Sequence, residues 1–531
     1  AGVLDMPENK IRVVSVPGGG AFGGKWDAPL FIHLALLSRK TGKPVRMAWS
    51  REESIFCHPK RHPARIAYKM GATREGKITA IQASIVADGG AYTSASAAVI
   101  RVMGSYIAGP YNIPHIRIEG KVAFTNTPIS GAMRGFGGPQ AVTATEVQVD
   151  ALARELGIGP VELRTKNLLK QGDTPAMAGV ILDGRVTLLD TVDAALKRAG
   201  PLQKPSGPHK KTGRGLACGM PIWDAGGMPA YHRRGTGAGV EMLPDGSVVV
   251  FSGACELGTG ISTVLAQIAA EELGVALEQV SVICGDSLVS PKAGPTVASR
   301  STYTAGNAVC LAAQKLKATV LEKASSMLEA PSAILKIAEG CIYVEEAPER
   351  TVQVREVAAA CFEEGTTLRS DSWFSANHAP FGQTFMTSLA DVEVDIETGE
   401  VTVLSVVAAH DIGKAINPLN TRGQLLGGAL QGIGYALQED LCTEKSFVKK
   451  ESFSEYIILG SMDMPQRLQE GMVEEPYATG PYGAKAVGEH GMVTAPPAVL
   501  NAIYDAVGIR ILNPPATPDK VLKALRDAGR R

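Results

Sequence analysis

The sequence lacks closely spaced cysteines, although it contains eight of them. They are scattered along the chain, without a C-x-x-C pair or any other clustered ligand spacing: Cys57, Cys218, Cys255, Cys284, Cys310, Cys341, Cys361 and Cys442. A structural zinc or an iron–sulfur cluster held by this chain alone needs cysteines close together, so neither is expected here. Scattered thiols are typical of the reduced state, which predicts a cytoplasmic protein.

A net charge and a long apolar run are also missing. The 53 basic and 53 acidic residues cancel, so no overall field attracts nucleic acid or an anionic membrane. No apolar run approaches the roughly 20 residues of a membrane span, and no basic leader followed by an apolar stretch opens the chain. We therefore expect no nucleic acid and no membrane among the partners, and any phosphate binding must be local.

An initiator methionine is absent as well. The chain starts at Ala1 and enters a strand pattern at residues 11–16 almost at once, like the middle of a domain. This start suggests a processed chain or one half of a split polypeptide. The total of 531 residues predicts two or more domains. We expect a first domain at 1–170, a linker with one helix at 171–212, and a second domain at 213–531.

The apolar periodicity predicts a mixture of strands and helices. Strands are expected at 11–16, 64–70, 77–87, 116–124, 248–252, 280–284, 390–396 and 401–408. Helices are expected at 28–39, 140–156, 160–169, 188–198, 262–273, 298–327, 497–507 and 518–526. Glycine is abundant, at 59 residues, and five glycine-rich turns each follow a predicted strand or precede a predicted helix. No single nucleotide fold needs five such turns, but a long polar ligand buried between domains does, because each turn can offer backbone N–H groups at close range.

The first glycine-rich turn excludes one familiar alternative. Gly19 to Lys25 satisfies G-x-x-x-x-G-K, the first part of a P-loop motif. The next residue, however, is Trp26, where an NTPase needs Ser or Thr to bind magnesium. The sequence therefore argues against an NTPase.

Three residues in other turns are candidates for chemistry. Glu489 lies in a glycine-rich turn ahead of a helix, where burial would raise its pKa toward that of a general base. Its other interpretation is a surface glutamate near a helix start. Arg134 and Phe136 emerge from one turn, so the arginine could hold an oxyanion or cofactor oxygen and the ring could stack on a flat substrate. Alternatively, the arginine caps a carbonyl and the phenylalanine fills the core.

Taken together, these turns resemble the molybdenum-binding large subunit of the xanthine dehydrogenase and aldehyde oxidase family. Six segments carry the resemblance, in the order the family has them: Gly19–Lys25, Ala132–Gln140, Glu256–Gly260, Ala298–Arg300, Asp411–Gly413 with Asn417-Pro418 and Gly423-Gln424, and Gly483–Glu489. The resemblance implies an α+β fold with two elongated molybdopterin-binding domains and the cofactor buried between them.

The resemblance also implies roles for particular residues. The molybdenum would be held by the pterin, with oxo, sulfido and hydroxyl ligands and no protein side chain bound to it. Glu489 matches the general base that deprotonates the hydroxyl. Substrate contacts fall on Arg134, Phe136 and Trp26, of which Trp26 departs from the family pattern. Cofactor contacts fall on Gly20, Ala21, Phe22, Gly23, Arg134, Gly258, Thr259, Gly260, Ala298, Ser299, Arg300, Gln424, Lys485 and Gly488.

Three departures from the family pattern bear on the substrate. Trp26 stands where purine oxidisers have a glutamate, which removes a polar anchor and makes xanthine less certain as the substrate. Thr259 replaces the usual glutamine of the pterin loop. Aerobic carbon monoxide dehydrogenases have a cysteine where this chain has Gly135-Phe136, so that branch is disfavoured.

The N-terminal portion of the family's large subunit, the cysteine-rich iron–sulfur part and the flavin part are not in this sequence. The resemblance therefore implies an iron–sulfur subunit, an FAD subunit and a chain carrying the N-terminal segment as partners, in a dimer of heteromers. The expected reaction is hydroxylation of a purine-like or nicotinate-like N-heterocycle. An aldehyde oxidoreductase and a non-catalytic assembly subunit of the same fold are the alternatives. The cofactor could be the mononucleotide form or the cytosine dinucleotide form.

Overall fold

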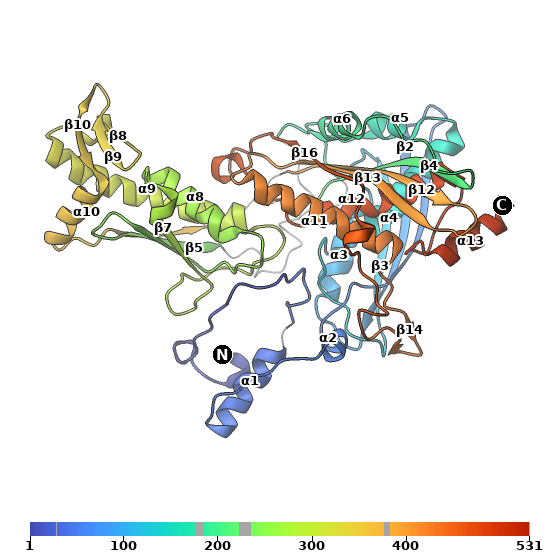
Figure 1. Ribbon diagram of the computed structural model, residues 1–531, viewed down its shortest axis with the longest axis horizontal. Coiled ribbons are helices and arrows are strands. Elements are labelled where there is room, and N and C mark those ends of the chain that lie inside the picture. Colours follow the sequence, from blue (N-terminus) through green and yellow to red (C-terminus); the bar gives the residue numbers. More distant parts are fainter. Residues whose placement is uncertain (28, 176–181, 183, 222–234, 376–382, 530–531) are drawn as a thin grey trace.

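The computed structural model describes residues 1–27, 29–175, 182, 184–221, 235–375 and 383–529. Within these residues, strands and helices are mixed in an α+β arrangement of separate sheets (Figure 1). In the described part of the chain, no helix combines the length and the apolar character needed to cross a membrane.

The first sheet is built from the N-terminal third of the chain. Its order is β1–β2–β3, with β1 (Ala64–Ala72) antiparallel to β2 (Ile78–Gly90) and β3 (His115–Phe124) parallel to β2. Helix α3 (Ser96–Tyr106) connects β2 to β3 and packs on both strands. Helices α4 (Gly138–Leu156) and α5 (Pro160–Asn167) follow, and α4 also packs on β1.

A second sheet forms the centre of the molecule in the order β16–β13–β12–β4. Its strands are β4 (Lys210–Gly219), β12 (Met386–Asp395), β13 (Val401–Asp411) and β16 (Arg467–Val473). Nine of the ten residues of β12 are buried, as expected for a strand covered on both faces. The covering helices are α6 (Leu188–Ala199), α11 (Pro418–Leu437) and α12 (Gly491–Val507).

A third group of elements extends away from these two sheets, on the left of Figure 1. Its main sheet has the order β11–β5–β6–β7, from β5 (Thr236–Met242), β6 (Val248–Ser252), β7 (Val280–Cys284) and β11 (Arg369–Phe374). Helices α8 (Ile261–Leu273) and α9 (Ser301–Leu328) pack against each other beside it. A smaller unit follows, made of β8 (Leu335–Ala338), β9 (Cys341–Val344), β10 (Ala347–Gln353) and α10 (Val354–Glu363).

The remaining elements lie near the two ends of the chain. An N-terminal arm carries two short 3-10 helices, Gly2–Leu4 and Glu8–Lys10, followed by α1 (Pro29–Thr41) and α2 (Arg51–Cys57). It lies below the rest of the molecule in Figure 1. Toward the C-terminus come the short hairpin β14 (Thr443–Glu444) and β15 (Phe447–Val448), two 3-10 helices, Ser461–Asp463 and Pro481–Gly483, and finally α13 (Pro518–Asp527).

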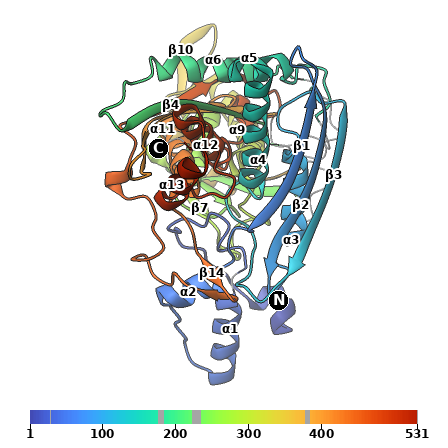
Figure 2. The same ribbon diagram turned by 90° about the vertical axis from the view of Figure 1, so that its right-hand side faces the viewer.

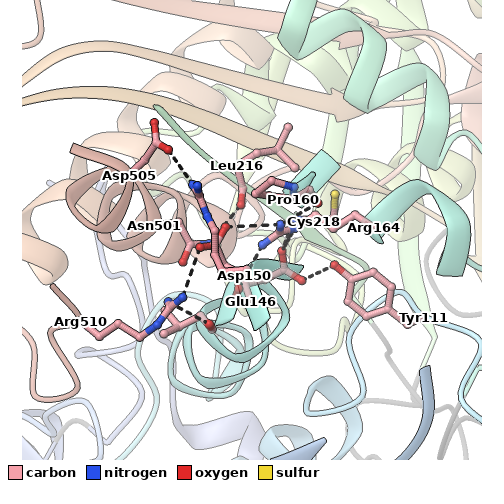
Figure 3. A network of polar contacts seen from close by, with 12 residues as sticks. Tyr111, Glu146, Asp150, Pro160, Arg164, Leu216, Cys218, Asn501, Asp505 and Arg510 are labelled. Carbon is pink, nitrogen blue, oxygen red and sulfur yellow. Dashed lines mark hydrogen bonds and ion pairs between the residues drawn. The ribbon is translucent and has the colours of Figure 1, made fainter. Parts of the chain in front are cut away.

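A buried ionic network joins the first sheet region to the central one (Figure 3). Glu146 on α4 accepts hydrogen bonds from Arg164 Nε at 2.8 Å, from the Cys218 backbone N–H at 2.9 Å and from the Tyr111 hydroxyl at 2.5 Å. Both Glu146 and Arg164 are 0% exposed. Asn501 of α12 donates to the Glu146 backbone carbonyl at 3.3 Å. Because a buried charge is costly without partners, these contacts hold α4, α5, β4 and α12 in one arrangement. Figure 2 shows α4 and α12 side by side.

Most of the predicted elements are confirmed, with shifts of a few residues at their ends. The predicted strand at 11–16 is wrong, because only Val14 forms a bridge, with Asp286. This segment runs along the loop after β7 instead of a sheet edge, held by the Arg12–Asp286 ion pair at 2.6 Å. The last long helix begins at Gly491 and not at residue 497, since Pro496 and Pro497 lie inside it and do not start it.

Helices α11 and α12 approach each other through glycine. A Cβ on Gly428 would lie 2.9 Å from Gly491 Cα and 3.1 Å from the Met492 backbone nitrogen. A Cβ on Gly491 would in turn lie 2.5 Å from the Leu425 carbonyl oxygen. These contacts are with backbone atoms, which cannot swing aside as a side chain could. The crossing therefore requires glycine at both positions.

We expect Gly428→Ala to lower the free energy of unfolding by about 1–3 kcal/mol, because the added methyl group overpacks a backbone contact. The neighbouring residue, Gly427, provides a matched control, since a Cβ there meets nothing within 4 Å. Gly427→Ala should be neutral or stabilise the helix by about 0.5–1 kcal/mol. Denaturant unfolding of the two variants tests this, and equal effects would contradict the close crossing.

Candidate active site

A cavity of about 980 Å³ lies where the three regions and the N-terminal arm meet. Its walls come from segments that are far apart in the sequence: residues 14–31, 49–58, 132–136, 255–264, 295–302, 412–424 and 484–489. A cavity of this size is at the upper end of what small-molecule and cofactor sites occupy. The predicted glycine-rich turns therefore converge on one cavity.

Three helices point their N-terminal ends into this cavity. Ile261 at the start of α8, Ser301 and Thr302 at the start of α9, and Asn420 and Thr421 in the first turn of α11 all line it. The first turn of a helix presents free backbone N–H groups and the positive end of the helix dipole, which favour anions. Lys414 lines the cavity just ahead of α11. This part of the wall is suited to a phosphate group.

The charged side chains that line the cavity are also mostly positive. Among the described residues that line it, the cationic side chains are those of Lys25, Arg51, Arg134, Lys414 and Lys485. Glu489 is the single carboxylate among the same lining residues. Lys485 is neutralised by a buried ion pair with Asp411 at 2.7 Å. Even so, the lining favours a ligand with negative charge.

Four residues of the cavity wall have a backbone conformation that is rare outside glycine. Phe22, Phe136, Ala298 and Ser299 have φ values of 49°, 48°, 56° and 54°. Each such residue costs about 1–3 kcal/mol and persists only where its surroundings impose it, most often at ligand sites. Gly23 is part of the same wall, and a Cβ there would lie 2.5 Å from the Ala132 carbonyl. The loops at 20–23 and 132–136 thus fit together with no room for side chains between them.

Arg134 connects these loops to helix α11. Its backbone N–H donates to the Phe22 carbonyl at 2.7 Å, and its guanidinium lies 5.6 Å from the centre of the Phe22 ring. Nε donates to the Gly488 carbonyl at 2.7 Å, Nη1 to Gln431 Oε1 at 3.0 Å, and Nη2 to the Gln424 carbonyl at 3.0 Å. Burial lowers the pKa of Arg134 to about 10, so the group is still a cation at neutral pH. Its bonded acceptors are all neutral.

Glu489 faces the cavity beside this arginine. Its Oε1 accepts the backbone N–H of Gly135 at 3.1 Å, and its Oε2 accepts the Ser299 hydroxyl at 3.5 Å. Burial raises the pKa of Glu489, and the Gly135 N–H, the Arg134 charge and the Ser299 hydroxyl offset part of that effect. A raised pKa makes the carboxylate a stronger proton acceptor.

Two buried histidines lie behind the cavity wall, His490 next to Glu489 and His410 at the end of β13. Their ring centres are 6.4 Å apart. Burial lowers the pKa of each to about 3, and the positive charge of Arg134 contributes to lowering both. Both imidazoles are therefore neutral near neutral pH.

Thirteen of the predicted site residues line this one cavity: Ala21, Phe22, Gly23, Trp26, Arg134, Phe136, Thr259, Ala298, Ser299, Gln424, Lys485, Gly488 and Glu489. Four others, Gly20, Gly258, Gly260 and Arg300, are not part of the described lining. The Arg300 side chain is 1% exposed and donates to the Thr236 hydroxyl at 3.2 Å, so it points into the protein.

The backbone N–H groups of Gly258 and Gly260 bind a carboxylate of the protein itself, that of Glu256. Their backbone N–H groups donate to Glu256 Oε1 at 2.8 Å and 3.0 Å, and the Ser262 N–H donates to Oε2 at 3.1 Å. Burial opposes ionisation of Glu256, but these N–H groups outweigh it and hold the pKa below its ordinary value. We expected the amides of this loop to bind a ligand, but they bind the Glu256 carboxylate instead. Within this loop, Thr259 lines the cavity.

Sequence reasoning assigned no role to Gln431, whose side chain accepts from Arg134. The available signal was its spacing, since Gln424 and Gln431 lie seven residues apart and so share one face of α11. The arm residues Trp49, Arg51 and His58 in the cavity wall were missed as well. They carried no motif, and only the fold brings them to the site.

The residues present fit a pterin cofactor that carries phosphate. Position 23 is glycine, and any side chain there would clash with the Ala132 backbone. A Cβ on Gly488 would lie 3.1 Å from Ser299 Oγ, so this position also has little room for a side chain. The starts of α9 and α11, together with Lys414, supply the environment that a phosphate needs, whereas the amides at the start of α8 are bound by Glu256. Glu489 and Arg134 lie close to this wall, with ionisation states set by burial.

Comparisons with known proteins agree with this site. Two models described as molybdopterin cofactor-binding domains match residues 1–168 and 187–465. The chain is 32% identical over 544 residues to the xanthine dehydrogenase molybdenum-binding subunit of Escherichia coli O157:H7, covering 99% of this chain and 71% of that protein. It is 30% identical over 564 residues to the nicotine 6-hydroxylase large subunit of Paenarthrobacter nicotinovorans, covering 98% and 67% of the two chains.

Solved structures show the same architecture. Quinoline 2-oxidoreductase from Pseudomonas putida 86 superposes with a TM-score of 0.88 at 26% identity, over 98% of this chain and 69% of that chain. The aldehyde oxidoreductase from Desulfovibrio gigas gives a TM-score of 0.83 at 27% identity, over 98% and 56% of the two chains. The chain therefore belongs to the molybdenum-binding subunits of the xanthine dehydrogenase and aldehyde oxidase family, and it is a molybdopterin-dependent oxidoreductase.

Proposed function

We propose that this chain is the catalytic portion of a molybdenum hydroxylase that acts on an aromatic N-heterocycle, with Glu489 as the general base. In the overall reaction, the substrate C–H group and one water give a C–OH group, two protons and two electrons. When bound, the molybdenum centre supplies the oxidising power and the site at which the water-derived oxygen becomes reactive. The observation that carries the proposal is the position of Glu489 in the cavity beside Arg134.

The protein's own part is to hold a proton acceptor in a fixed position. Oε1 of Glu489 is held by the Gly135 N–H at 3.1 Å, whereas the contact of Oε2 with Ser299 is longer, at 3.5 Å. Oε2 is therefore the oxygen that can accept a proton. The Ser299 hydroxyl also accepts the Glu489 backbone N–H at 2.9 Å, which fixes the base relative to its loop.

The cofactor would be held by the walls of the cavity around the base. Phe22 and Gly23 would lie against the metal centre, and Ala298, Ser299, Thr259 and Gln424 against the pterin. Lys414 and the start of α11 would receive the phosphate. The cofactor would be either the mononucleotide or the cytosine dinucleotide form. We further propose that electrons leave through iron–sulfur and FAD partner chains. Among the relatives is one named as the gamma chain of a dehydrogenase complex.

The substrate class is proposed from the aromatic rings in the wall. Phe22, Trp26 and Phe136 all line the cavity, and Trp26 and Phe136 also pack against the cluster of buried residues around α3. Flat aromatic rings gain from stacking or edge contacts with such a wall, and a small aldehyde gains less. Relatives named as nicotine 6-hydroxylase large subunit and quinoline 2-oxidoreductase take ring substrates according to their names. One named aldehyde oxidoreductase makes an aldehyde the second candidate.

We expect Glu489→Gln to lower kcat by about 10²–10⁴-fold, because the amide cannot accept the proton. The amide can still accept the Gly135 N–H, so the fold and the bound molybdenum should be retained. The measurement is the turnover of the purified complex together with its molybdenum content. Full turnover in a variant that keeps its metal would remove Glu489 from the mechanism.

The pH dependence of kcat/KM should have an acid limb set by Glu489. Only the ionised carboxylate can act as base, so activity is lost as the pH falls through the folded-state pKa. Because burial raises that pKa, the midpoint should lie above the ordinary value of 4.5. His410 and His490 are neutral, so the pH profile should show no second transition near 6.5, the ordinary pKa of histidine. A limb centred at or below 4.5 would contradict the buried base.

Phe136→Leu tests the ring-stacking wall. Loss of an aromatic contact worth about 0.5–1.5 kcal/mol should raise KM for a heterocyclic substrate by roughly 3- to 10-fold. The KM for a small aliphatic aldehyde should change little. Phe124, which is 70% exposed on β3, gives the control variant Phe124→Leu. Equal changes for both substrate classes would favour the aldehyde oxidoreductase.

A further inference from the structure

Helix α11 offers one polar side chain to the active-site arginine from outside the cavity. Gln431 is not part of the described cavity lining, yet its Oε1 accepts Arg134 Nη1 at 3.0 Å. An arginine has only donors, so the amide must present its oxygen and not its nitrogen to the guanidinium. Gln431 therefore contacts neither the substrate space nor the proposed cofactor space directly.

The other bonds of Arg134 show what this contact adds. Nε is held by the Gly488 carbonyl and Nη2 by the Gln424 carbonyl, so two of the three guanidinium nitrogens are bound by backbone. Gln431 binds the third nitrogen. With all three held, the guanidinium plane cannot rotate, and its charge stays beside the loop that carries Glu489.

Every acceptor in this set is neutral, which determines where the charge acts. A carboxylate bonded to Arg134 would cancel most of its field. A glutamine at position 431 has nearly the shape of glutamate but leaves that field intact. Among the charged and titratable groups described around this site, the Arg134 charge acts on Glu489, His410 and His490. The Arg61 charge also acts on Glu489, and the Glu489 charge acts on Tyr106. The two histidines are neutral, so the two arginines are the cations near the base.

We propose that Gln431 is a positioning residue, which holds the Arg134 guanidinium against the Gly488 loop with a neutral acceptor and so keeps a full positive charge beside the Glu489 carboxylate. This inference rests on the proposed function for its catalytic meaning, but its physical content concerns residues of this chain alone. It also explains why an amide occupies a position where a carboxylate would bind the arginine more strongly.

The test is the pH titration of Glu489 in the purified complex, monitored by infrared spectroscopy. The band of the protonated Glu489 carboxyl group is identified as the one that is missing in Glu489→Gln. Gln431→Glu keeps the shape and the acceptor but adds a negative charge that pairs with Arg134. The midpoint of the Glu489 titration should rise by about one pH unit, because Arg134, once paired with the introduced carboxylate, no longer favours the ionised form of Glu489. The acid limb of kcat/KM should move by the same amount. KM measured well above both midpoints should stay as in the wild type.

Two further variants make the result decisive. Gln82→Glu adds the same charge on the exposed face of β2 and should leave the midpoint unchanged. Gln431→Met removes the acceptor without adding charge, so Arg134 Nη1 is released and the midpoint should rise by less than in Gln431→Glu. Gln431→Met is informative even if Gln431→Glu does not fold. A wild-type midpoint in every folded variant at position 431 would overturn the positioning role.

The infrared titration also separates this inference from the proposed function. It requires no turnover, so a shifted midpoint in a complex that hydroxylates no heterocycle would uphold the positioning role and reject the proposed reaction. An unshifted midpoint in a complex that does hydroxylate would reject only the positioning role. A role in packing alone would lower the melting temperature of Gln431→Met and leave the midpoint where it is.

Discussion

A buried arginine with neutral partners is the interaction on which the active site depends. Arg134 joins the loop at 132–136, the loop at 488 and helix α11 through its three guanidinium nitrogens. No ion pair of Arg134 occurs within the described residues. Burying an unpaired charge is costly, so all three segments must be in place before the guanidinium is satisfied. The same unpaired charge then acts on Glu489.

The rest of the fold serves to bring these segments together. Glycines at 428 and 491 let α11 and α12 cross at backbone contact, which places the Glu489 loop against the face of α11 that carries Gln424 and Gln431. The Glu146–Arg164 pair fixes α4, which begins directly after the Arg134 loop, against β4 and α12. The site is thus assembled from both family-matched regions together with the loop at 484–489, which follows the second of them.

Local signals in the sequence were sufficient for much of this fold. Helices such as α8 and α9 and strands such as β7 have clear apolar periodicity, and the observed bounds agree with the expected ones within a few residues. The segment at 11–16 has the same alternation but pairs with a loop, which no local pattern can distinguish from pairing with a sheet. Phe22 and Ser299, which have rare backbone conformations, were identified as site residues through the family resemblance.

Both local and long-range contacts that no motif specifies limited the prediction of the site. Arg300 was expected at the cofactor but packs inward on Thr236, and the amides of Gly258 and Gly260 are bound by Glu256, two to four residues away. The resemblance supplied the segment but not the direction of each side chain. Gln431 was missed for the opposite reason, because its partner, Arg134, lies about 300 residues earlier in the chain.

The central claim is that this cavity holds a molybdenum-bearing pterin beside Glu489. The most direct test is the molybdenum and pterin content of the natively purified complex, by elemental analysis and by release of the oxidised pterin. We expect about one molybdenum and one pterin for each copy of this chain. A well-folded complex with its full set of partner chains and neither component would contradict it.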